Sequence, residues 1–114
     1  MFAIKTWCLP KLSEEVLNAI HLDLVKATTS FEPIRNIGIT DQSSMLVLFP
    51  KDMMEYGLGQ EIFIEAVDLH DSVGLGVRNE LATKLVLVVK AYFSEARVNC
   101  KVRPCSSADG SAEA

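Results

Sequence analysis

The stretch FPKDMMEYGLG (residues 49–59) is the most informative part of this chain. It joins two apolar runs, Met45–Phe49 and Glu61–Leu69, through a segment that opens with proline, closes with glycine and carries a tyrosine. Every position of Met45–Phe49 is apolar, which is typical of a strand buried on both faces. The second run is rich in Ile, Phe and Val, which favours another strand. The connection between them is long enough to shape a pocket.

Length and composition indicate one globular domain. The chain has 114 residues, of which 49% are hydrophobic and 23% charged, as expected for a single packed core. A mean hydropathy of +0.23 predicts apolar surface that a partner subunit covers. The net charge of -4, without a Lys/Arg cluster, argues against nucleic-acid binding. We expect residues 1–104 to form the domain and residues 105–114 to form a disordered tail.

The amino terminus and the cysteines indicate a cytoplasmic protein. Residues Met1–Lys5 lack the features of a secretory signal, and the apolar runs are too short to span a bilayer. Cys8, Cys100 and Cys105 are an odd number at spacings that match no zinc pattern, so we expect reduced thiols and no metal. Nothing in the sequence calls for a cofactor.

The first half of the chain predicts a strand followed by a helix. Alternation over Phe2–Trp7 indicates a strand, and Ser13 then supplies an N-cap hydroxyl. Apolar residues recur at helical spacing after Ser13, until Thr28-Thr29-Ser30 and Pro33 end the pattern. The following run, Ile34–Ser44, is compatible with either a short strand or a loop.

The second half repeats this order. After the strand Glu61–Leu69, the two glycines of His70–Gly76 predict a loop, and an apolar stripe that includes Leu81 and Leu85 predicts a helix. Arg97–Arg103 alternates cleanly and predicts a last strand. On this strand Val98, Cys100 and Val102 should face the helices. The opposite polar stripe, Arg97, Asn99, Lys101 and Arg103, either faces a neighbouring subunit or protects an exposed sheet edge by its charge.

The resulting element order predicts an α/β (α+β) fold. Two βαβ units would place both helices on one face of a four-stranded sheet. Two architectures fit. One is the ferredoxin-like split βαβ sheet, and the other is the tautomerase sandwich, in which each half is a parallel βαβ unit and three subunits pack sheet against sheet.

Two motifs resemble the tautomerase superfamily, the family of macrophage migration inhibitory factor and oxalocrotonate tautomerase. The first is Pro50-x-x-Met53-Met54-x-Tyr56-Gly57, which is similar to the proline, large apolar pair, aromatic and glycine that follow the family's second long strand. The second is Leu69-His70 followed by Val73-Gly74 and Arg78-Asn79, which is similar to the family's loop before the second helix. The resemblance covers residues 2–103, and the order of the motifs carries it.

The resemblance implies keto–enol chemistry at the amino terminus. In the family, an amino-terminal proline amine acts as general acid and base. Here Phe2 follows the initiator, and the proline position falls on Met1, so the corresponding group is a primary amine. A large second residue disfavours removal of Met1. Glu32 also precedes Pro33 where the family has lysine.

The resemblance also implies a site at a subunit boundary of a homotrimer. Met1 would be catalytic, and the substrate-binding residues would be Arg35, Lys51, Tyr56 and Val73. The two cations suit a small carboxylate ligand, since the guanidinium fork donates two parallel hydrogen bonds. We therefore expect a divergent tautomerase-like protein that binds and isomerises a small 2-oxo or enol carboxylate. The alternative is a non-catalytic oligomeric binding or interaction module of tautomerase or ferredoxin-like fold.

Overall fold

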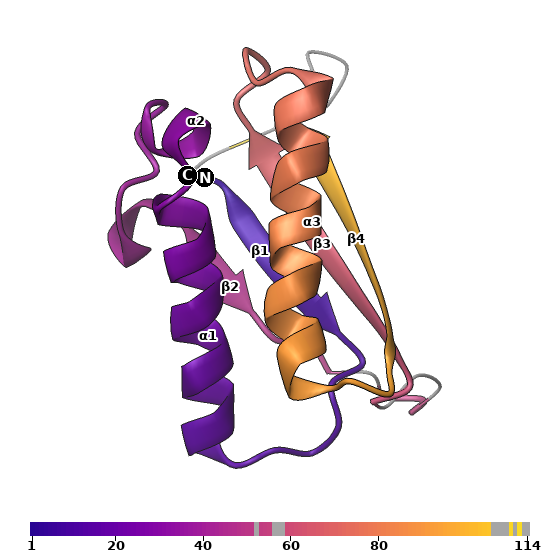
Figure 1. Cartoon of the computed structure of the whole chain (residues 1–114). Coiled ribbons are helices and arrows are strands. Elements are labelled where there is room, and N and C mark those ends of the chain that lie inside the picture. The colour runs from indigo at the N-terminus through magenta and orange to yellow at the C-terminus, as the bar shows by residue number, and fades with distance from the viewer. Residues whose placement is uncertain (52, 56–58, 106–109, 111, 113–114) are drawn as a thin grey trace.

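The structure is a computed structural model that describes residues 1–51, 53–55, 59–105, 110 and 112. Two long helices lie side by side over one sheet (Figure 1). The elements in chain order are β1 (Ala3–Trp7), α1 (Glu14–Thr29), α2 (Glu32–Arg35), the 3₁₀ turn η1 (Gln42–Ser44), β2 (Leu46–Leu48), β3 (Glu61–Leu69), α3 (Leu75–Tyr92) and β4 (Arg97–Pro104). The run 34–44, left open by its sequence, thus holds the end of α2 and η1 rather than a strand.

Strand pairing distinguishes the two architectures that the sequence allows. The sheet order is β2-β1-β3-β4. Strands β1 and β2 are parallel neighbours, with Ala3 opposite Leu46, and β3 and β4 are also parallel neighbours. The two pairs meet through the antiparallel contact of β1 with β3. In a split βαβ unit another strand would separate the parallel pair, so the ferredoxin-like alternative is excluded, and the predicted two βαβ units are confirmed.

Local sequence explains why α1 begins where it does. The Ser13 side chain accepts a hydrogen bond from the Val16 backbone N–H at 3.3 Å, and Glu14 and Glu15 lie in the first turn. Both features offset the unpaired N–H groups and positive dipole at a helix start. At the other end, the Thr28 hydroxyl donates to the Leu24 carbonyl at 2.9 Å within the core.

The core lies between the two long helices and one face of the sheet. The fully buried side chains come from all three layers: Ile4, Ile20, Leu24, Ile34, Ile62, Ile64, Leu69, Leu81, Leu85 and Val89. On β4, Val98, Cys100 and Val102 pack against this cluster, as their alternation predicted. The Tyr92 hydroxyl donates to the Asp23 carboxylate and so joins α3 to α1.

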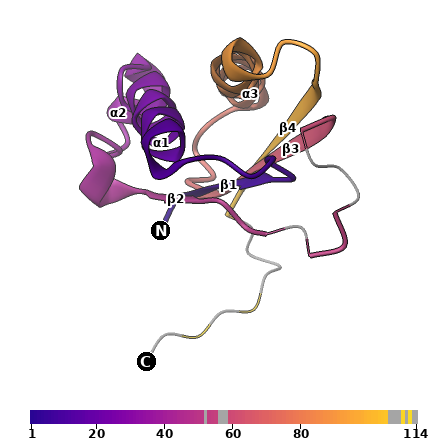
Figure 2. The same cartoon turned by 90° about the horizontal axis from the view of Figure 1, so that it is seen from below.

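None of the helices formed by the described residues covers the other face of the sheet, as Figure 2 shows in a view from below. Leu46 and Leu48 are 47% and 43% exposed on this face. The prediction that Met45–Phe49 is buried on both faces is therefore wrong for the single chain, because α1 and α3 cover one face only. Trp7 and Phe63 lie opposite one another on the same open face and are half-buried. We call this surface, with Leu46, Leu48, Trp7, Phe63 and Val67, the open face.

None of the helices in the described part of the chain is long and apolar enough to cross a bilayer. The predicted disordered tail, residues 105–114, falls mostly outside the described residues, so it stays a prediction.

Candidate functional site

Met1 lies at one end of the sheet, where three loops meet. It is 70% exposed, while Phe2, the next residue, is only 4% exposed and packs in the core. The Phe2 carbonyl accepts a hydrogen bond from the Leu46 N–H at 3.0 Å, which fixes the start of β1 against β2. The first residue therefore projects from an anchored strand.

Arg35 lies at the same end of the molecule. It is the last residue of α2, which Figure 1 places at the end of the sheet where the chain begins. The neighbouring Ile34 is fully buried and anchors this short helix, whereas Arg35 is exposed.

Val73 also belongs to this end, because β3 runs antiparallel to β1 and delivers the following loop there. It is 6% exposed and packs in the core. Its backbone N–H donates to the His70 carbonyl at 3.1 Å, which closes a tight turn. Val73 can therefore form an apolar floor for a site, beneath the exposed residues His70–Ser72.

Lys51 lies at the opposite end of the sheet. It follows β2, which is parallel to β1, so the two strands carry Lys51 away from the end where Met1 precedes β1. Lys51 lines a hollow of about 500 Å³ with Pro10, Phe49 and Glu55. The described part of the 49–59 connection thus lines a hollow through Phe49, Pro50, Lys51 and Glu55. Tyr56, the remaining predicted site residue, lies outside the described residues.

Gly59 closes this connection for a steric reason. Its φ is +74°, and a Cβ built there would approach the ring of Pro10 to 3.3 Å. Its N–H donates to the Cys8 carbonyl at 2.8 Å. Only glycine combines this backbone conformation with so close an approach, so the segment that carries Lys51 is tied to the end of β1.

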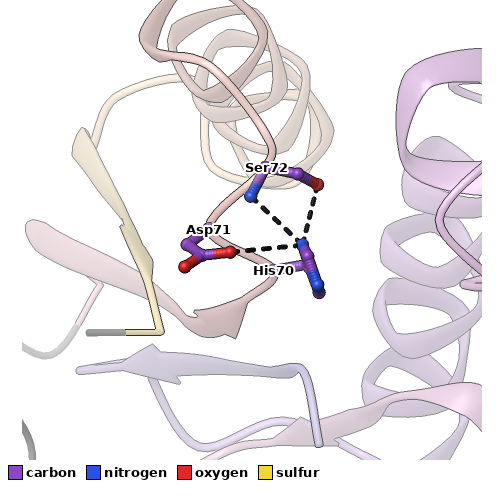
Figure 3. A network of polar contacts seen from close by, with 3 residues as sticks. All are labelled: His70, Asp71 and Ser72. Atoms are coloured by element: carbon purple, nitrogen blue, oxygen red, sulfur yellow. Dashed lines mark hydrogen bonds and ion pairs between the residues drawn. The ribbon is translucent and has the colours of Figure 1, made fainter. Parts of the chain in front are cut away.

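Figure 3 shows a polar network in the loop between β3 and α3. The Ser72 backbone N–H donates to His70 Nδ1 at 3.1 Å, and Ser72 Oγ lies 2.7 Å from the same nitrogen. Asp71 Oδ1 is 3.5 Å from it as well. In a hydrolytic triad the nucleophile and the acid use different ring nitrogens. Because both partners here face Nδ1, the network holds the turn and does not form a triad.

The two carboxyl-terminal thiols differ sharply in environment. Burial among apolar groups raises the pKa of the Cys100 thiol to about 12, while Cys105 is exposed just beyond β4. The thiolate is the reactive form of cysteine. Neither thiol is in a disulfide.

We predict that iodoacetamide at pH 8 modifies Cys105 quickly and leaves Cys100 untouched in the folded protein, since a thiol whose pKa is about 12 stays protonated there. Peptide mapping after timed quenching measures both rates. Unfolding in guanidinium should make the two rates similar. Equal rates in the native protein would contradict the placement of Cys100 under the helices.

Comparison with known proteins bears on the fold. No protein-family model and no curated protein matches the chain. Solved structures do match: a crystal structure of 5-carboxymethyl-2-hydroxymuconate delta-isomerase superposes with a TM-score of 0.60 and 10% sequence identity, over 99% of this chain and 89% of that one. The chain has a tautomerase-like fold. The resemblance inferred from the two motifs is thereby confirmed at the level of the fold.

Met1 and Lys51, two of the predicted site residues, lie far apart in the single chain. Within one chain, Met1, Arg35 and Val73 share one end of the sheet, and Lys51 occupies the other. A subunit boundary can bring opposite ends of two chains together. Sequence reasoning overlooked Arg78 on α3, which lines a hollow beside β4 and whose Nε is buried without a hydrogen-bond partner among the described residues.

Proposed function

We propose that this protein is an isomerase-like protein that binds a small 2-oxo or enol carboxylate and moves a proton on it. The observation that carries the proposal is the exposed Met1 just before the anchored start of β1. The chain that carries this residue has the fold of a hydroxymuconate isomerase. A terminal amine can take a proton from the carbon beside a carbonyl group and return it at another position, as general acid–base catalysis requires.

We propose a substrate-binding role for two residues at the same end of the sheet as Met1, Arg35 and Val73. Arg35 is exposed at the same end and would hold the carboxylate through its fork. Val73 would supply an apolar floor. Proton transfer from carbon needs no cofactor when a base and a charge-stabilising cation are both in place, and we propose none.

We further propose that the working form is a homotrimer, with the open face buried between subunits. Lys51 and Tyr56 of a partner subunit would then complete the site around Met1. The support is the exposure of Leu46 and Leu48, which a stable packing partner would remove from water. We also propose a cytoplasmic location, which suits the unpaired thiols of Cys100 and Cys105.

The Arg35→Gln variant tests the carboxylate-binding role. We expect KM for a 2-oxo carboxylate such as phenylpyruvate to rise by about tenfold or more, since a charge-assisted hydrogen bond contributes about 1.5–3 kcal/mol. Ultraviolet absorbance of the enol follows the reaction. Arg97→Gln is the matched control, because Arg97 is also exposed but lies at the far end of the sheet, 3.5 Å from Glu61. Equal effects of the two changes would contradict the role of Arg35.

A non-catalytic binding protein of the same fold is the second candidate. The observation that favours it is that Met1, and not a proline, stands at the position of the family's catalytic proline, so the terminal amine is a primary amine. Saturable binding of the carboxylate by a trimer that gives no turnover above buffer would establish this candidate instead.

A further inference from the structure

The turn after β3 carries an exposed imidazole at the same end of the sheet as Met1. Ala3 of β1 lies opposite Val67 of β3 in an antiparallel register, so the residue that begins the chain and the residues that follow β3 lie at one end of the sheet. The His70 side chain is 67% exposed there, and Met1 is 70% exposed. A terminal amine and an imidazole therefore share this end of the molecule.

An irregularity in β3 turns His70 out of the core. Ile62, Ile64 and Ala66 are buried, and if this alternation continued, His70 would point inward as well. The register between β3 and β4 shifts between Ala66 and Leu69, and Asp68 has a φ of +61°. After the shift Leu69 is fully buried, whereas Asp68 is exposed. The shift thus places the imidazole outside the core, as bulges beside functional sites often do.

The turn also fixes the direction of the ring. Leu69 and Val73 flank it and pack in the core, and the Val73 N–H donates to the His70 carbonyl at 3.1 Å. The Ser72 backbone N–H donates to His70 Nδ1, also at 3.1 Å. Figure 3 shows Nε2 on the side of the ring that points away from Asp71 and Ser72. Both the backbone and the imidazole are therefore held before any ligand binds.

The hydrogen bond from Ser72 determines which ring nitrogen carries the proton. A backbone N–H can only donate, so Nδ1 of His70 accepts, and the proton of the neutral imidazole lies on Nε2. In the charged imidazole both nitrogens carry protons. Nε2 therefore presents an N–H group in either state. At this end of the sheet His70 is a hydrogen-bond donor and not a base.

We propose that His70 donates a hydrogen bond from Nε2 to the carbonyl oxygen of the substrate and is a catalytic residue. This inference rests on the proposed isomerase function. When the Met1 amine takes a proton from the carbon beside the carbonyl group, the electron pair of that C–H bond forms a carbon–carbon double bond. The carbonyl π pair then moves onto oxygen, where negative charge develops. A donor fixed in advance stabilises this charge without reorganisation, and a neutral imidazole can fill the role.

Kinetics of two His70 variants test the role. His70→Phe keeps a ring but removes the donor, so we expect kcat for phenylpyruvate to fall by about a hundredfold or more, the range for loss of one such donor. KM should change little, because the oxygen is charged only in the transition state. His70→Gln keeps an N–H donor and should lose less. His21→Gln, which changes the other histidine of the chain, should leave kcat unchanged.

A measurement without turnover separates this inference from the proposed function. The chain has two histidines, so His21→Gln assigns their signals in long-range ¹H–¹⁵N spectra. At pH 8 we expect the His70 proton on Nε2, and oxalate, a planar analogue of an enolate, should shift the Nε2 signal. A response to oxalate in a protein that gives no turnover would reject isomerase activity and keep His70 as the donor.

Three results would overturn the inference. They are a proton on Nδ1 of His70, no shift of its Nε2 signal at millimolar oxalate, and an unchanged kcat in a folded His70→Phe variant. The last result, with turnover intact, would leave the proposed function in place and remove only the role of His70.

Discussion

Replacement of both Leu46 and Leu48 by lysine is expected to convert the trimer that we propose to monomers. These leucines are 47% and 43% exposed on the open face of the isolated chain. Complete burial of an exposed leucine contributes about 1.5–3 kcal/mol, so covering each of these half-exposed side chains contributes roughly half of that, and a closed trimer repeats the contribution in every subunit. Buried lysines would instead bring unpaired charge into the interface, which is costly. Sedimentation velocity measures the change directly.

The helical layer offers a matched control. Leu22 on α1 and Leu87 on α3 are 50% and 63% exposed, and their replacement by lysine changes charge and hydropathy by the same amounts. We expect this double variant to sediment like the unmodified protein. If it dissociates the oligomer while Leu46→Lys/Leu48→Lys does not, the subunits pack through their helices and the open face is not the interface.

A Gly-Ser extension before Met1 is expected to lower turnover by about a hundredfold or more, the range that a positioned acid–base group contributes. The extension moves the amine away from the anchored start of β1, where the buried Phe2 holds Met1 at the sheet end. It leaves every side chain in place. The rate constant kcat for ketonisation of an enol carboxylate is the relevant measurement.

The same Gly-Ser sequence added after Ala114 provides the control for the extension. It should leave kcat unchanged. Trimer formation should also be unaffected by either extension, which sedimentation checks. Full activity with the amino-terminal extension would show that Met1 is not the base, and the proposed role of this residue would then be wrong.

The regular elements could be predicted because their patterns are local. The strand Glu61–Leu69 has the bounds that its sequence predicts, and β4 extends only one residue further, to Pro104. The Ser13 cap and the apolar spacing after it define α1. The helix α3 continues through the β-branched run 86–89, because packing of Leu85 and Val89 in the core outweighs the local preference.

Other features depend on contacts that a sequence pattern does not express. An all-apolar run such as Met45–Phe49 predicts a strand with both faces buried. It does not indicate whether the same chain or a partner subunit covers each face. The short helix α2 is held by the buried Ile34 and not by helical periodicity. The positions of Met1 and Lys51 follow from the parallel pairing of β1 with β2. That pairing places the two residues at opposite ends of the sheet in one chain, so the site that we propose, with both residues, needs a partner subunit.

The most direct test of the account labels the Met1 amine while turnover is measured. An amine-directed reagent at pH 7, followed by mass mapping of the amino terminus, gives the fraction of Met1 modified, and the keto–enol assay on the same samples gives the remaining rate. The account predicts turnover above buffer that falls in proportion to Met1 modification. No turnover above buffer, or a rate that persists when Met1 is fully modified, would contradict it.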